Sequence, residues 1–416
     1  MKKFVKPSKI NGQVDAPASK SMVQRALTAA LLAEEPSTIL NVTYSSDAQA
    51  ALRVIQALGA RVTIRDKDVY IEGGMNPTGE ALNCGESGLS MRMFSAVAAL
   101  WHRELTLTGE GSLFTRPISM IEKPLKELGV AVTTTNGCPP LTVEGPLRGG
   151  EAEVDGSVSS QFLTGLLIAL PAAPQDSCLK VKNLKSTPYI DMTLTLLKTC
   201  GIRVENSDYQ VFRMKGKQRY RPGEYRVEGD WSGASFLLVA GALGGSIRVT
   251  GLDTSSPQAD RRIIDALKAA GAGVTLGGSS VEIKKKALTA FDFDAADCPD
   301  LFPPLVALAC NCTGTTAIKG VERLKYKESS RAAVLQKEFS ALGARIRLDG
   351  DMMKIEGTKL AGGTVDSHND HRIAMAGALA AINAEGEITI AGSECVAKSY
   401  PGFFEDFSSI GGIVHE

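Results

Sequence analysis

Basic and hydroxyl side chains recur where apolar helices are expected to begin, and this placement is the first sign of a chemical function. A helix N-terminus carries a partial positive charge, so a cation there costs roughly 0.3–1 kcal/mol in the absence of a ligand. The free N–H groups of such helix ends bind phosphate and carboxylate, and Ser, Lys and Arg add charge-assisted bonds. We therefore expect one shared site for a small ligand with several negative charges, built from Lys20, Ser21, Arg25, Ser87, Gly88, Arg92, Arg116, Ser159, Ser160, Gln161, Lys327, Arg331, Asn369, Arg372 and, after a strand, Lys398.

The spacing within these groups supports convergence on a ligand. Ser21 and Arg25 are four residues apart, as are Lys327 and Arg331, so each pair is expected to share one face of a helix. Gly88 lacks a side chain and would let a ligand approach the backbone closely.

Two acidic residues stand among these cations and could transfer protons. Asp300 precedes the apolar segment LFPPLVALAC, and Glu328 lies between Lys327 and Arg331. A helix-capping Asp and a salt-bridged Glu are the ordinary structural explanations, whereas the functional interpretation is a carboxylate pair for general acid–base chemistry. Asp294 and Asp297 remain alternatives to Asp300 in that role.

Several other kinds of site are disfavoured. No G-x-x-x-x-G-K-[ST] loop and no G-x-G-x-x-G after a strand occurs, which argues against nucleotide and dinucleotide binding. The histidines lack metalloprotease spacing, and His368 and His371 are expected to hold the turn DSHNDHR. The eight cysteines form no C-x-x-C pair, so reduced thiols are expected rather than disulfides or zinc. We expect no metal and no cofactor.

Composition places these residues in a globular protein of at least two domains. The chain has 416 residues, of which 44% are hydrophobic and 22% charged. The 46 cations balance the 46 anions, which disfavours nucleic acid and membrane surfaces as partners. The N-terminus has no apolar signal region, and no run of about 18 apolar residues occurs. We expect a cytoplasmic monomer that acts on small molecules.

One short pattern recurs along the chain. It consists of an apolar residue, three further residues, Gly, two further residues and another apolar residue. Its copies are spaced by 68 to 72 residues and contain Gly59, Gly129, Gly201, Gly271, Gly343 and, more weakly, Gly411. Each copy predicts a helix that ends at a left-handed glycine and leads directly into a strand. Regular spacing over six copies predicts an internal repeat.

Each repeat also contains a helix that is apolar almost all round, such as SGLSMRMFSAVAALW or SGASFLLVAGAL, and such a helix should be buried. Alternating strands and helices predict an α/β fold with some antiparallel pairing. Six repeats suggest two domains of three repeats each. The predicted boundaries give one domain of residues 1–18 and 229–416 and another of residues 19–228.

The motifs of the whole chain resemble those of the enolpyruvyl transferases, and among these the EPSP synthase family. In family order they are PASKSMVQRALTAALL, GESGLSMR, TRPI, GSVSSQFLTGLL, STPYIDMTL, CPD, KYKESSR, NDHRIAM and VAKSYPGFF, spanning residues 14 to 407. The resemblance implies two inverted α/β barrel domains, each of three βαβαββ-type repeats, which close over substrates in the cleft between them.

The resemblance also implies a reaction: transfer of the enolpyruvyl group of phosphoenolpyruvate to the 5-hydroxyl of shikimate 3-phosphate, with release of phosphate, in chorismate and aromatic amino acid biosynthesis. Carried over by position, shikimate 3-phosphate would be bound by Lys20, Ser21, Arg25, Ser159, Ser160, Gln161, Ser186, Tyr189, Asp300 and Lys327. Phosphoenolpyruvate would be bound by Lys20, Gly88, Arg116, Gln161, Arg331, Arg372 and Lys398.

The implied chemistry is addition followed by elimination through a tetrahedral intermediate. We assign Asp300 as the base toward the 5-hydroxyl and Glu328 as the acid, then the base, at the methyl carbon. Lys20 would assist the departure of phosphate. The division of labour among these three residues is the step that the sequence leaves open.

At two positions of the segment GESGLSMR the sequence departs from the family pattern, and two alternative functions compete with the assignment. Glu86 and Leu89 stand where the family usually has Asn and Thr, and an extra carboxylate would repel phosphoenolpyruvate unless Glu86 turns outward or pairs with a cation. One rival is the sister transferase that acts on UDP-N-acetylglucosamine, which relies on a loop cysteine that the TRPI segment lacks. The other is a non-catalytic anion-binding homologue, which would not need Asp300 and Glu328.

Overall fold

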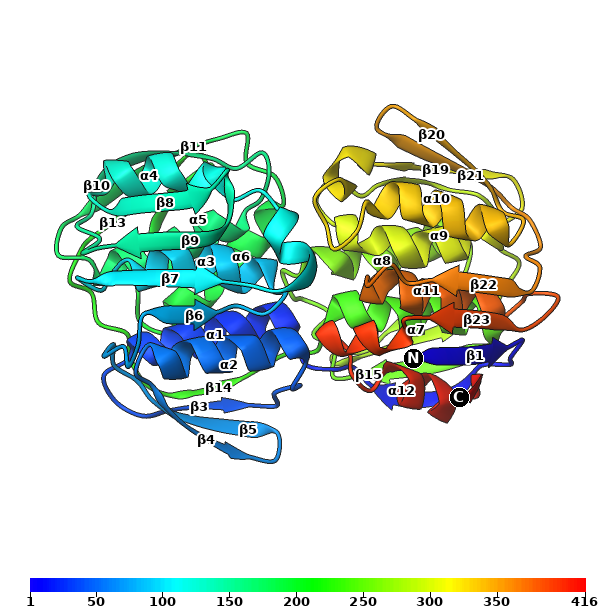
Figure 1. Cartoon of the computed structure of the whole chain (residues 1–416). Coiled ribbons are helices and arrows are strands. Elements are labelled where there is room, and N and C mark those ends of the chain that lie inside the picture. The colour runs from blue at the N-terminus through cyan, green and yellow to red at the C-terminus, as the bar shows by residue number, and fades with distance from the viewer. The chain divides into compact units, whose positions relative to one another are not determined.

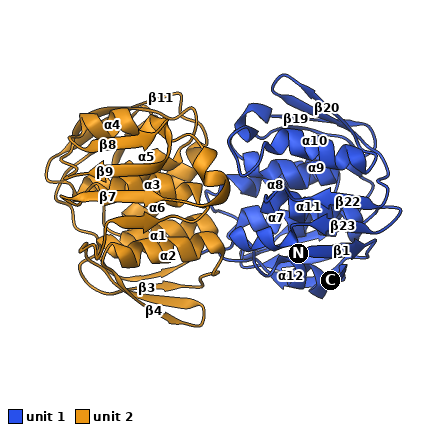
Figure 2. Ribbon diagram, viewed as in Figure 1, with its two compact units in different colours: residues 1–19, 228–416 blue, residues 20–227 orange.

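The computed structural model describes residues 1–416, and the chain divides into two compact units (Figures 1 and 2). Unit 1 comprises Met1–Ser19 and Glu228–Glu416, and unit 2 comprises Lys20–Val227. The boundaries predicted from the sequence differ from these by one residue. None of the helices is both long and apolar enough to cross a membrane.

Unit 2 contains three four-stranded sheets, each with one parallel and two antiparallel strand pairs. Their strand orders are β14-β3-β5-β4, β6-β7-β9-β8 and β10-β11-β13-β12. The strands are β3 (Ser37–Leu40), β4 (Arg61–Arg65), β5 (Asp68–Glu72), β6 (Ala81–Asn83), β7 (Glu104–Thr108), β8 (Ala131–Thr135), β9 (Cys138–Glu144), β10 (Gly150–Asp155), β11 (Ser177–Lys182), β12 (Glu205–Ser207), β13 (Val211–Met214) and β14 (Glu224–Arg226).

Unit 1 repeats this plan with three further four-stranded sheets. Their orders are β16-β17-β15-β2, β18-β19-β21-β20 and β22-β23-β1-β24. The strands are β1 (Lys2–Lys6), β2 (Asn11–Asp15), β15 (Ser246–Thr250), β16 (Gly273–Leu276), β17 (Ser280–Lys284), β18 (Asp292–Asp294), β19 (Thr315–Lys319), β20 (Arg345–Asp349), β21 (Met352–Glu356), β22 (Gly363–Asp366), β23 (Ile388–Ala391) and β24 (Ile413–His415).

The predicted fold class is confirmed: the chain is α/β, with six βαβαββ-type repeats, three in each unit. The sequence β6-α3-β7-α4-β8-β9 is one complete repeat. Three sheets take a strand from far along the chain. Strand β14 completes the sheet that begins at β3, β2 pairs with β15, and β1 lies between β23 and β24.

One helix of each repeat is buried on all sides, as its uniform hydrophobicity predicts. These helices are α1 (Lys20–Leu32), α3 (Gly88–Ala98), α5 (Gln161–Ala169), α7 (Trp231–Gly244), α9 (Phe302–Cys310) and α11 (His371–Ala381). Close packing between them needs small residues at some contacts. A Cβ atom at Gly165 in α5 would lie 2.5 Å from the carbonyl oxygen of Met93 in α3, so a larger residue there would force the two helices apart.

The second helix of each repeat buries one face and ends before a glycine with positive φ. These helices are α2 (Ser46–Ala57), α4 (Glu122–Glu127), α6 (Thr187–Thr199), α8 (Ile263–Ala269), α10 (Arg331–Ala341) and α12 (Phe403–Ser409). All six repeat glycines have φ between 77° and 113°, so the prediction of left-handed helix ends is confirmed.

Two local predictions about site residues were wrong. Lys327 and Glu328 lie in a turn before α10, which begins at Arg331, so Lys327 and Arg331 do not share a helical face. The hydroxyl of Ser329 donates to Asp370 (3.0 Å), and this tertiary bond holds the chain outside the helix. Arg116 follows the 3₁₀ turn η1 (Gly111–Thr115) in extended conformation, and the helical segment begins only with η2 (Ser119–Ile121).

Candidate active site

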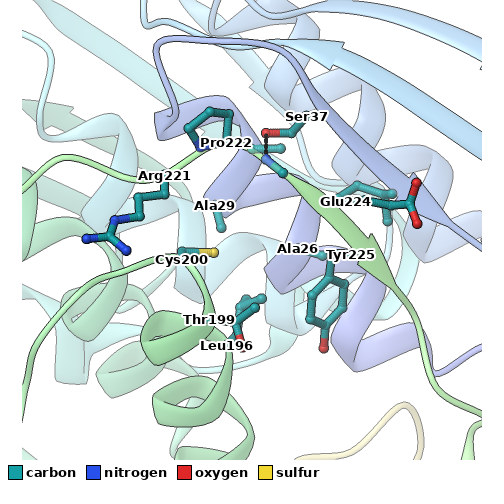
Figure 3. A pocket seen from close by; sticks show the side chains of 13 residues that line it. Ala26, Ala29, Ser37, Leu196, Thr199, Cys200, Arg221, Pro222, Glu224 and Tyr225 are labelled. Atoms are coloured by element: carbon teal, nitrogen blue, oxygen red, sulfur yellow. Dashed lines mark hydrogen bonds between the residues drawn. The ribbon is translucent and has the colours of Figure 1, made fainter.

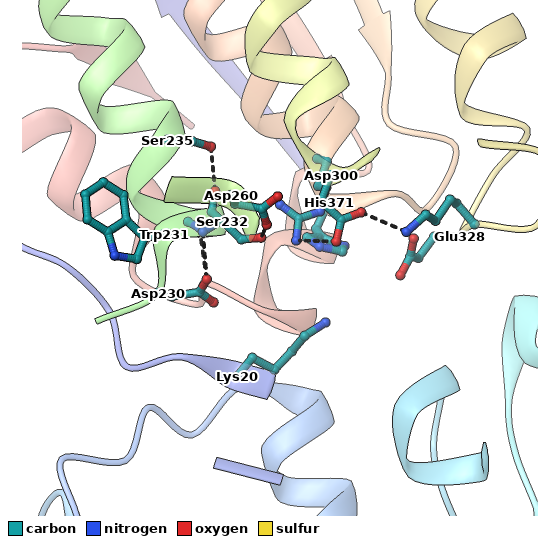
Figure 4. Close-up of polar contacts among 12 residues, drawn as sticks. Lys20, Asp230, Trp231, Ser232, Ser235, Asp260, Asp300, Glu328 and His371 are labelled. Atoms are coloured by element: carbon teal, nitrogen blue, oxygen red, sulfur yellow. Dashed lines mark hydrogen bonds and ion pairs between the residues drawn. The ribbon is translucent and has the colours of Figure 1, made fainter. Parts of the chain in front are cut away.

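In unit 1, a cluster of charged side chains forms around the guanidinium group of Arg331, the first residue of α10. Figure 4 shows two of its acids, Asp300 and Glu328. Arg331 is fully buried and bonds three carboxylates: Asp300 through Nη1 (2.8 Å), Glu328 through Nη2 (2.6 Å) and Asp370 through Nε (2.9 Å). These carboxylates come from η5 (Pro299–Leu301), the turn before α10, and the N-cap of α11. The acids Asp300 and Glu328 therefore meet at one guanidinium.

Asp300 accepts bonds from two further cations of unit 1. Lys327 Nζ lies 3.1 Å from Oδ1, and Arg372 Nη2 lies 3.2 Å from Oδ2. Burial raises the pKa of Asp300, but Arg372, Lys327 and Arg331 outweigh it and hold the pKa well below its usual value. Asp300 is therefore ionised at neutral pH, which is the state that a general base requires.

Of the two alternatives to Asp300, Asp294 is separated from this cluster. It lies at the end of β18, its carboxylate bonds Lys319 Nζ at 3.3 Å, and its side chain is half exposed. Nothing in its surroundings links it to Arg331. The structure thus favours Asp300 over Asp294 as the acidic partner of Glu328.

A second buried carboxylate, Asp260, lies beside Asp300 and was not singled out from the sequence. Asp260 accepts a hydrogen bond from the hydroxyl of Ser232, in the first turn of α7. Burial and the nearby charge of Asp300 raise its pKa to about 6, although Arg372 opposes the shift. Asp230 caps the same helix by accepting bonds from the amides of Ser232 and Gly233. The N-terminus of α7 thus adjoins the Asp300 cluster.

Lys398, at the end of the 3₁₀ segment η7 (Ser393–Lys398), is joined to the cluster through the backbone. Its Nζ donates to the carbonyl oxygen of Asn369 at 2.7 Å, and its side chain is buried. Asn369 directly precedes Asp370, whose carboxylate caps α11 by accepting from the amide of Arg372 at 3.0 Å. One short loop therefore connects Lys398, Arg331 and Arg372.

In unit 2, Arg25 is a buried cation whose hydrogen-bond partners are all neutral. It donates to Thr193 Oγ1 (3.0 Å) and Thr164 Oγ1 (3.3 Å) and to the backbone oxygens of Ser21 (2.8 Å) and Tyr189 (3.2 Å). Burial without a carboxylate lowers the pKa of Arg25 to about 10. A buried guanidinium without a counter-ion is stabilised when an anion binds nearby.

Lys20, the first residue of α1, is paired within unit 2. Its Nζ lies 2.8 Å from Oδ2 of Asp47, in the first turn of α2. The sequence pattern did not single out Asp47, although the preceding Ser45 and Ser46 mark a helix start. This pairing offsets the conflict between a cation and the helix dipole at the start of α1.

A third group of unit 2 lies around the N-termini of α3 and α5. Arg92 Nη1 donates to Gln161 Oε1 (2.8 Å), and its Nη2 donates to the carbonyl oxygen of Pro117 (3.0 Å). These bonds hold the segment that carries Arg116. Arg116 is buried, its Nε has no hydrogen-bond partner, and a Cβ atom at Gly88 would lie 2.8 to 2.9 Å from its guanidinium atoms. Gly88 and Arg116 are therefore in contact.

The remaining predicted residues of unit 2 also lie at helix starts. Ser160 is the N-cap of α5, and the hydroxyl of Ser159 accepts from the amide of Gln161 at 3.2 Å. Ser186 is the N-cap of α6 in left-handed conformation, with φ of 58°. Tyr189 lies in the first turn of α6, whose Thr193 contacts Arg25.

The carboxyl group of Glu86 lies against Gly111, at the start of η1. A Cβ atom at Gly111 would lie 2.6 Å from the carboxyl group of Glu86, so this carboxylate rests against the start of η1. Gly111 has φ of 53° and no side chain, and it leaves the space that Glu86 fills. Whether Glu86 turns outward or pairs with a cation stays a prediction.

The two units differ in how far their buried cations are neutralised. In unit 1, Lys327, Arg331 and Arg372 face Asp300, Glu328 and Asp370. In unit 2, Arg25 and Arg116 bond no carboxylate, whereas Lys20 does. Unit 2 thus offers uncompensated cations for an anion, and unit 1 offers carboxyl groups held by cations, of which Asp300 is ionised.

Two further features of the structure concern other kinds of site. No group of three or more His, Cys, Asp or Glu side chains could hold a metal ion, and all eight cysteines are free thiols. A pocket lies in unit 2 between α1, α6 and the segment around β14 (Figure 3). Alanines of α1, Leu196 and Cys200 form much of its wall, and none of the predicted site residues lines it.

Comparisons with known proteins agree over the full chain. A family model described as EPSP synthase (3-phosphoshikimate 1-carboxyvinyltransferase) matches residues 4–407. Curated proteins named 3-phosphoshikimate 1-carboxyvinyltransferase from Clostridium novyi (strain NT) and Methanocorpusculum labreanum are each 39% identical. The first match covers 99% of this chain and 97% of the relative, and the second covers 100% of both.

Solved structures give the same result for the fold. The structure of an EPSP synthase from Acinetobacter baumannii is similar with a TM-score of 0.84 and 27% identity, covering 100% of both chains. The enolpyruvyl transferase NikO from Streptomyces tendae is similar with a TM-score of 0.79 and 17% identity, covering 100% of this chain and 98% of that one. At that identity, the second likeness concerns the fold alone.

Proposed function

Because the chain belongs to the EPSP synthase (3-phosphoshikimate 1-carboxyvinyltransferase) family, we propose a mechanism in which the clusters of both units act on one pair of substrates. The chain is a transferase of the shikimate pathway with EPSP synthase activity. In this mechanism the enolpyruvyl group of phosphoenolpyruvate passes to the 5-hydroxyl of shikimate 3-phosphate, and inorganic phosphate leaves. The meeting of Asp300 and Glu328 at Arg331 is the observation that carries the proposal.

Residues of unit 2 would bind shikimate 3-phosphate through its two anionic groups. Arg25 supplies an uncompensated charge for the carboxylate, with Ser21 beside it on α1. The phosphate would lie at the helix starts that carry Ser159, Ser160 and Ser186, where free N–H groups bind anions. Gln161 and Tyr189 would contact the ring, and Lys327 of unit 1 would add a further charge.

Phosphoenolpyruvate would be bound by cations of both units. Arg116 contributes a buried guanidinium beside Gly88, and Arg331, Arg372 and Lys398 contribute the cations of the Asp300 cluster. Lys20 and Gln161 would contact this substrate as well. Closure of the two units over the substrates remains our prediction, as does a monomeric state.

The addition step begins at the 5-hydroxyl. Asp300, held ionised by its cations, would accept the hydroxyl proton while the oxygen attacks C2 of phosphoenolpyruvate. Glu328 would donate a proton to the CH2 carbon, which becomes a methyl group in a tetrahedral phosphate ketal. Positive charge that develops at C2 would be stabilised by the neighbouring carboxylates.

Elimination reverses the proton transfer at carbon. The C2–O bond to phosphate breaks, and Lys20 would stabilise the charge on the departing group. Glu328, now ionised, would accept a proton from the methyl group and so restore the vinyl CH2. The products are 5-enolpyruvylshikimate 3-phosphate and inorganic phosphate. Glu328 is then protonated again, and Asp300 would pass the hydroxyl proton to the departing phosphate, directly or through water.

The purified chain is expected to release inorganic phosphate when it is given shikimate 3-phosphate and phosphoenolpyruvate, with neither metal nor nucleotide added. The measurement is phosphate release together with chromatographic detection of the enolpyruvyl product. UDP-N-acetylglucosamine offered with phosphoenolpyruvate is expected to give no release. Release with that sugar alone would assign the chain to the sister activity, and release with neither acceptor would support a non-catalytic anion-binding homologue.

Gly88→Ala is expected to raise the KM for phosphoenolpyruvate about tenfold, because the new methyl group displaces the Arg116 guanidinium. The thermal midpoint should stay the same or rise, since Ala favours helix over Gly by up to about 1 kcal/mol. Steady-state kinetics with varied phosphoenolpyruvate measure the first effect. Gly79→Ala is the matched control, because nothing lies within 4 Å of its added Cβ atom. An unchanged KM in Gly88→Ala would remove Arg116 from the proposed site.

A further inference from the structure

The loop between β22 and α11 carries no predicted acid or base, yet it anchors several cations of the unit 1 cluster. Asp370 at its end bonds Arg331 Nε (2.9 Å) and caps α11 at the amide of Arg372 (3.0 Å). The carbonyl oxygen of Asn369 accepts from Lys398 Nζ (2.7 Å). Any displacement of this loop would therefore move the guanidinium and ammonium groups that it holds.

The backbone of this loop is held in an unfavourable conformation. His368 and Asn369 are consecutive non-glycine residues with φ of 49° and 57°, in the left-handed region that side chains disfavour. Two such residues in a row persist only where surrounding contacts determine them. The structure must therefore contain bonds that fix the loop.

A carboxylate of α10, Glu338, supplies those bonds. Its Oε2 accepts from the backbone amide of Asp366 (2.9 Å), and its Oε1 accepts from Nε2 of His368 (2.8 Å). Because an ionised carboxylate can only accept, Nε2 of His368 carries the proton in this contact. The backbone amide of His368 in turn donates to Asp366 Oδ1 (2.7 Å).

Glu338 is buried, and it remains charged. Burial raises its pKa, but bonds from His368, the Asp366 amide and Lys337 outweigh this effect and leave the pKa below its usual value. An ionised group accepts both bonds, and such charge-assisted bonds are stronger than neutral ones. Nothing in the proposed chemistry uses this carboxylate, and no substrate-binding role falls on it.

The position of Glu338 along α10 gives its bonds a consequence for the cluster. Arg331 and Glu338 are seven residues apart, so they lie two turns apart on one face of the helix. The loop is thus fastened to α10 at two points, by Asp370 to Arg331 and by Asp366 and His368 to Glu338. Fixing both ends sets the orientation of the loop as well as its distance from the helix.

We propose that Glu338 and His368 form a positioning pair that locks the Asp366–Asp370 loop onto α10 and thereby aligns Arg331, Arg372 and Lys398 for substrate. Neither residue contacts substrate in this arrangement; both act through the loop. The assignment of these three cations to phosphoenolpyruvate rests on the proposed function. The alignment of the cations by the loop does not.

The test uses variants that remove the contact and keep the backbone. His368→Asn retains a residue type that tolerates the left-handed conformation and loses the bond to Glu338. It is expected to raise the KM for phosphoenolpyruvate about tenfold and to leave the KM for shikimate 3-phosphate unchanged and kcat at saturating substrate within about twofold. Glu338→Ala removes both anchoring bonds and is expected to raise the same KM further.

Two comparisons separate positioning from general support of the fold. His415→Asn and Glu385→Gln make the same or a closely related chemical change at exposed sites and should match the unmodified chain in every parameter. The double variant His368→Asn with Glu338→Ala should be no worse than Glu338→Ala alone, because the two residues act as one unit. Lower thermal stability with an unchanged KM for phosphoenolpyruvate would overturn the proposal.

A measurement that needs no substrate tests the role of Glu338 and His368 independently of the proposed function. Amide hydrogen exchange of Asp370 and Arg372 should accelerate at least tenfold in His368→Asn, while exchange within α9 stays the same. If the unmodified chain released no phosphate, the proposed function would fail while this measurement still tested the loop. Equal exchange rates at Asp370 and Arg372 in the two proteins would also overturn the proposal.

Discussion

Replacing either proposed proton-transfer carboxylate by its amide is expected to lower kcat by about 10²- to 10⁴-fold, the usual contribution of general acid–base catalysis. In Asp300→Asn the base is lost, because the carboxylate that three cations hold ionised becomes a neutral amide. In Glu328→Gln the group that must exchange a proton with the methyl carbon is lost. Steady-state phosphate release measures both effects.

Substrate binding should survive these substitutions, and this distinguishes lost chemistry from a lost site. Asp300→Asn leaves Lys327 and Arg372 without their shared carboxylate, so the dissociation constants of the anionic substrates should stay equal or fall. Asp294→Asn is the matched control, since the carboxylate of Asp294 is half exposed and accepts from Lys319 Nζ (3.3 Å) and the amide of Ala296 (3.0 Å). Turnover near that of the unmodified chain in Asp300→Asn would exclude Asp300 as the base, and in Glu328→Gln it would exclude Glu328 from proton transfer.

Arg331→Met is expected to lower the free energy of unfolding by about 3–5 kcal/mol, the loss typical when one partner of a buried ion pair is removed. The substitution leaves Asp300, Glu328 and Asp370 buried around an uncharged side chain. For a unit of this size, such a loss corresponds to a thermal midpoint lower by roughly 6–20 °C. Calorimetry or circular dichroism during heating measures the change.

The effect of Arg331→Met should depend on pH in a defined direction. Arg331 is one of the cations that hold the pKa of Asp300 below its usual value, so this ionised carboxylate contributes stability above the unfolded pKa of about 3.9. That contribution is lost as the pH falls through the lower, folded-state pKa. The stability difference between Arg331→Met and the unmodified chain should therefore be largest near neutral pH and should narrow in acid.

An exposed ion pair serves as the control for the charge change itself. Arg345 bonds Glu356 across two strands at 2.7 Å, and its side chain is 69% exposed. Arg345→Met should change the free energy of unfolding by less than about 1 kcal/mol, because solvent screens such pairs. Equal effects of Arg331→Met and Arg345→Met would mean that burial of the Asp300 cluster does not determine its strength.

Local physical rules made much of the fold predictable from the sequence. A glycine that ends a helix and leads into a strand is a local signal, so six copies of it revealed the repeat. Helices that are apolar on all sides were likewise predicted to be buried. The strand pairings that complete some of the sheets join segments far apart in the chain. Strand β2 pairs with β15, and β1 pairs with β23 and β24.

The same distinction between local and long-range interactions applies to the candidate site. Residue types at helix starts indicated a polyanionic ligand, because the dipole and free N–H groups belong to each helix alone. The partners of these residues were not predictable. Asp47 for Lys20, Asp370 for Arg331 and Thr193 for Arg25 lie 27, 39 and 168 residues away along the chain.

The sequence by itself determined the repeat, the α/β class and the anionic character of the ligand, because each follows from interactions within about ten residues or from the motifs of a family. Only the tertiary structure decided which cations are neutralised, that Lys327 and Glu328 precede α10, and that Glu338 fastens the loop before α11. Charge neutralisation depends on which segments come within a few ångströms of each other, and packing of the whole unit sets those distances.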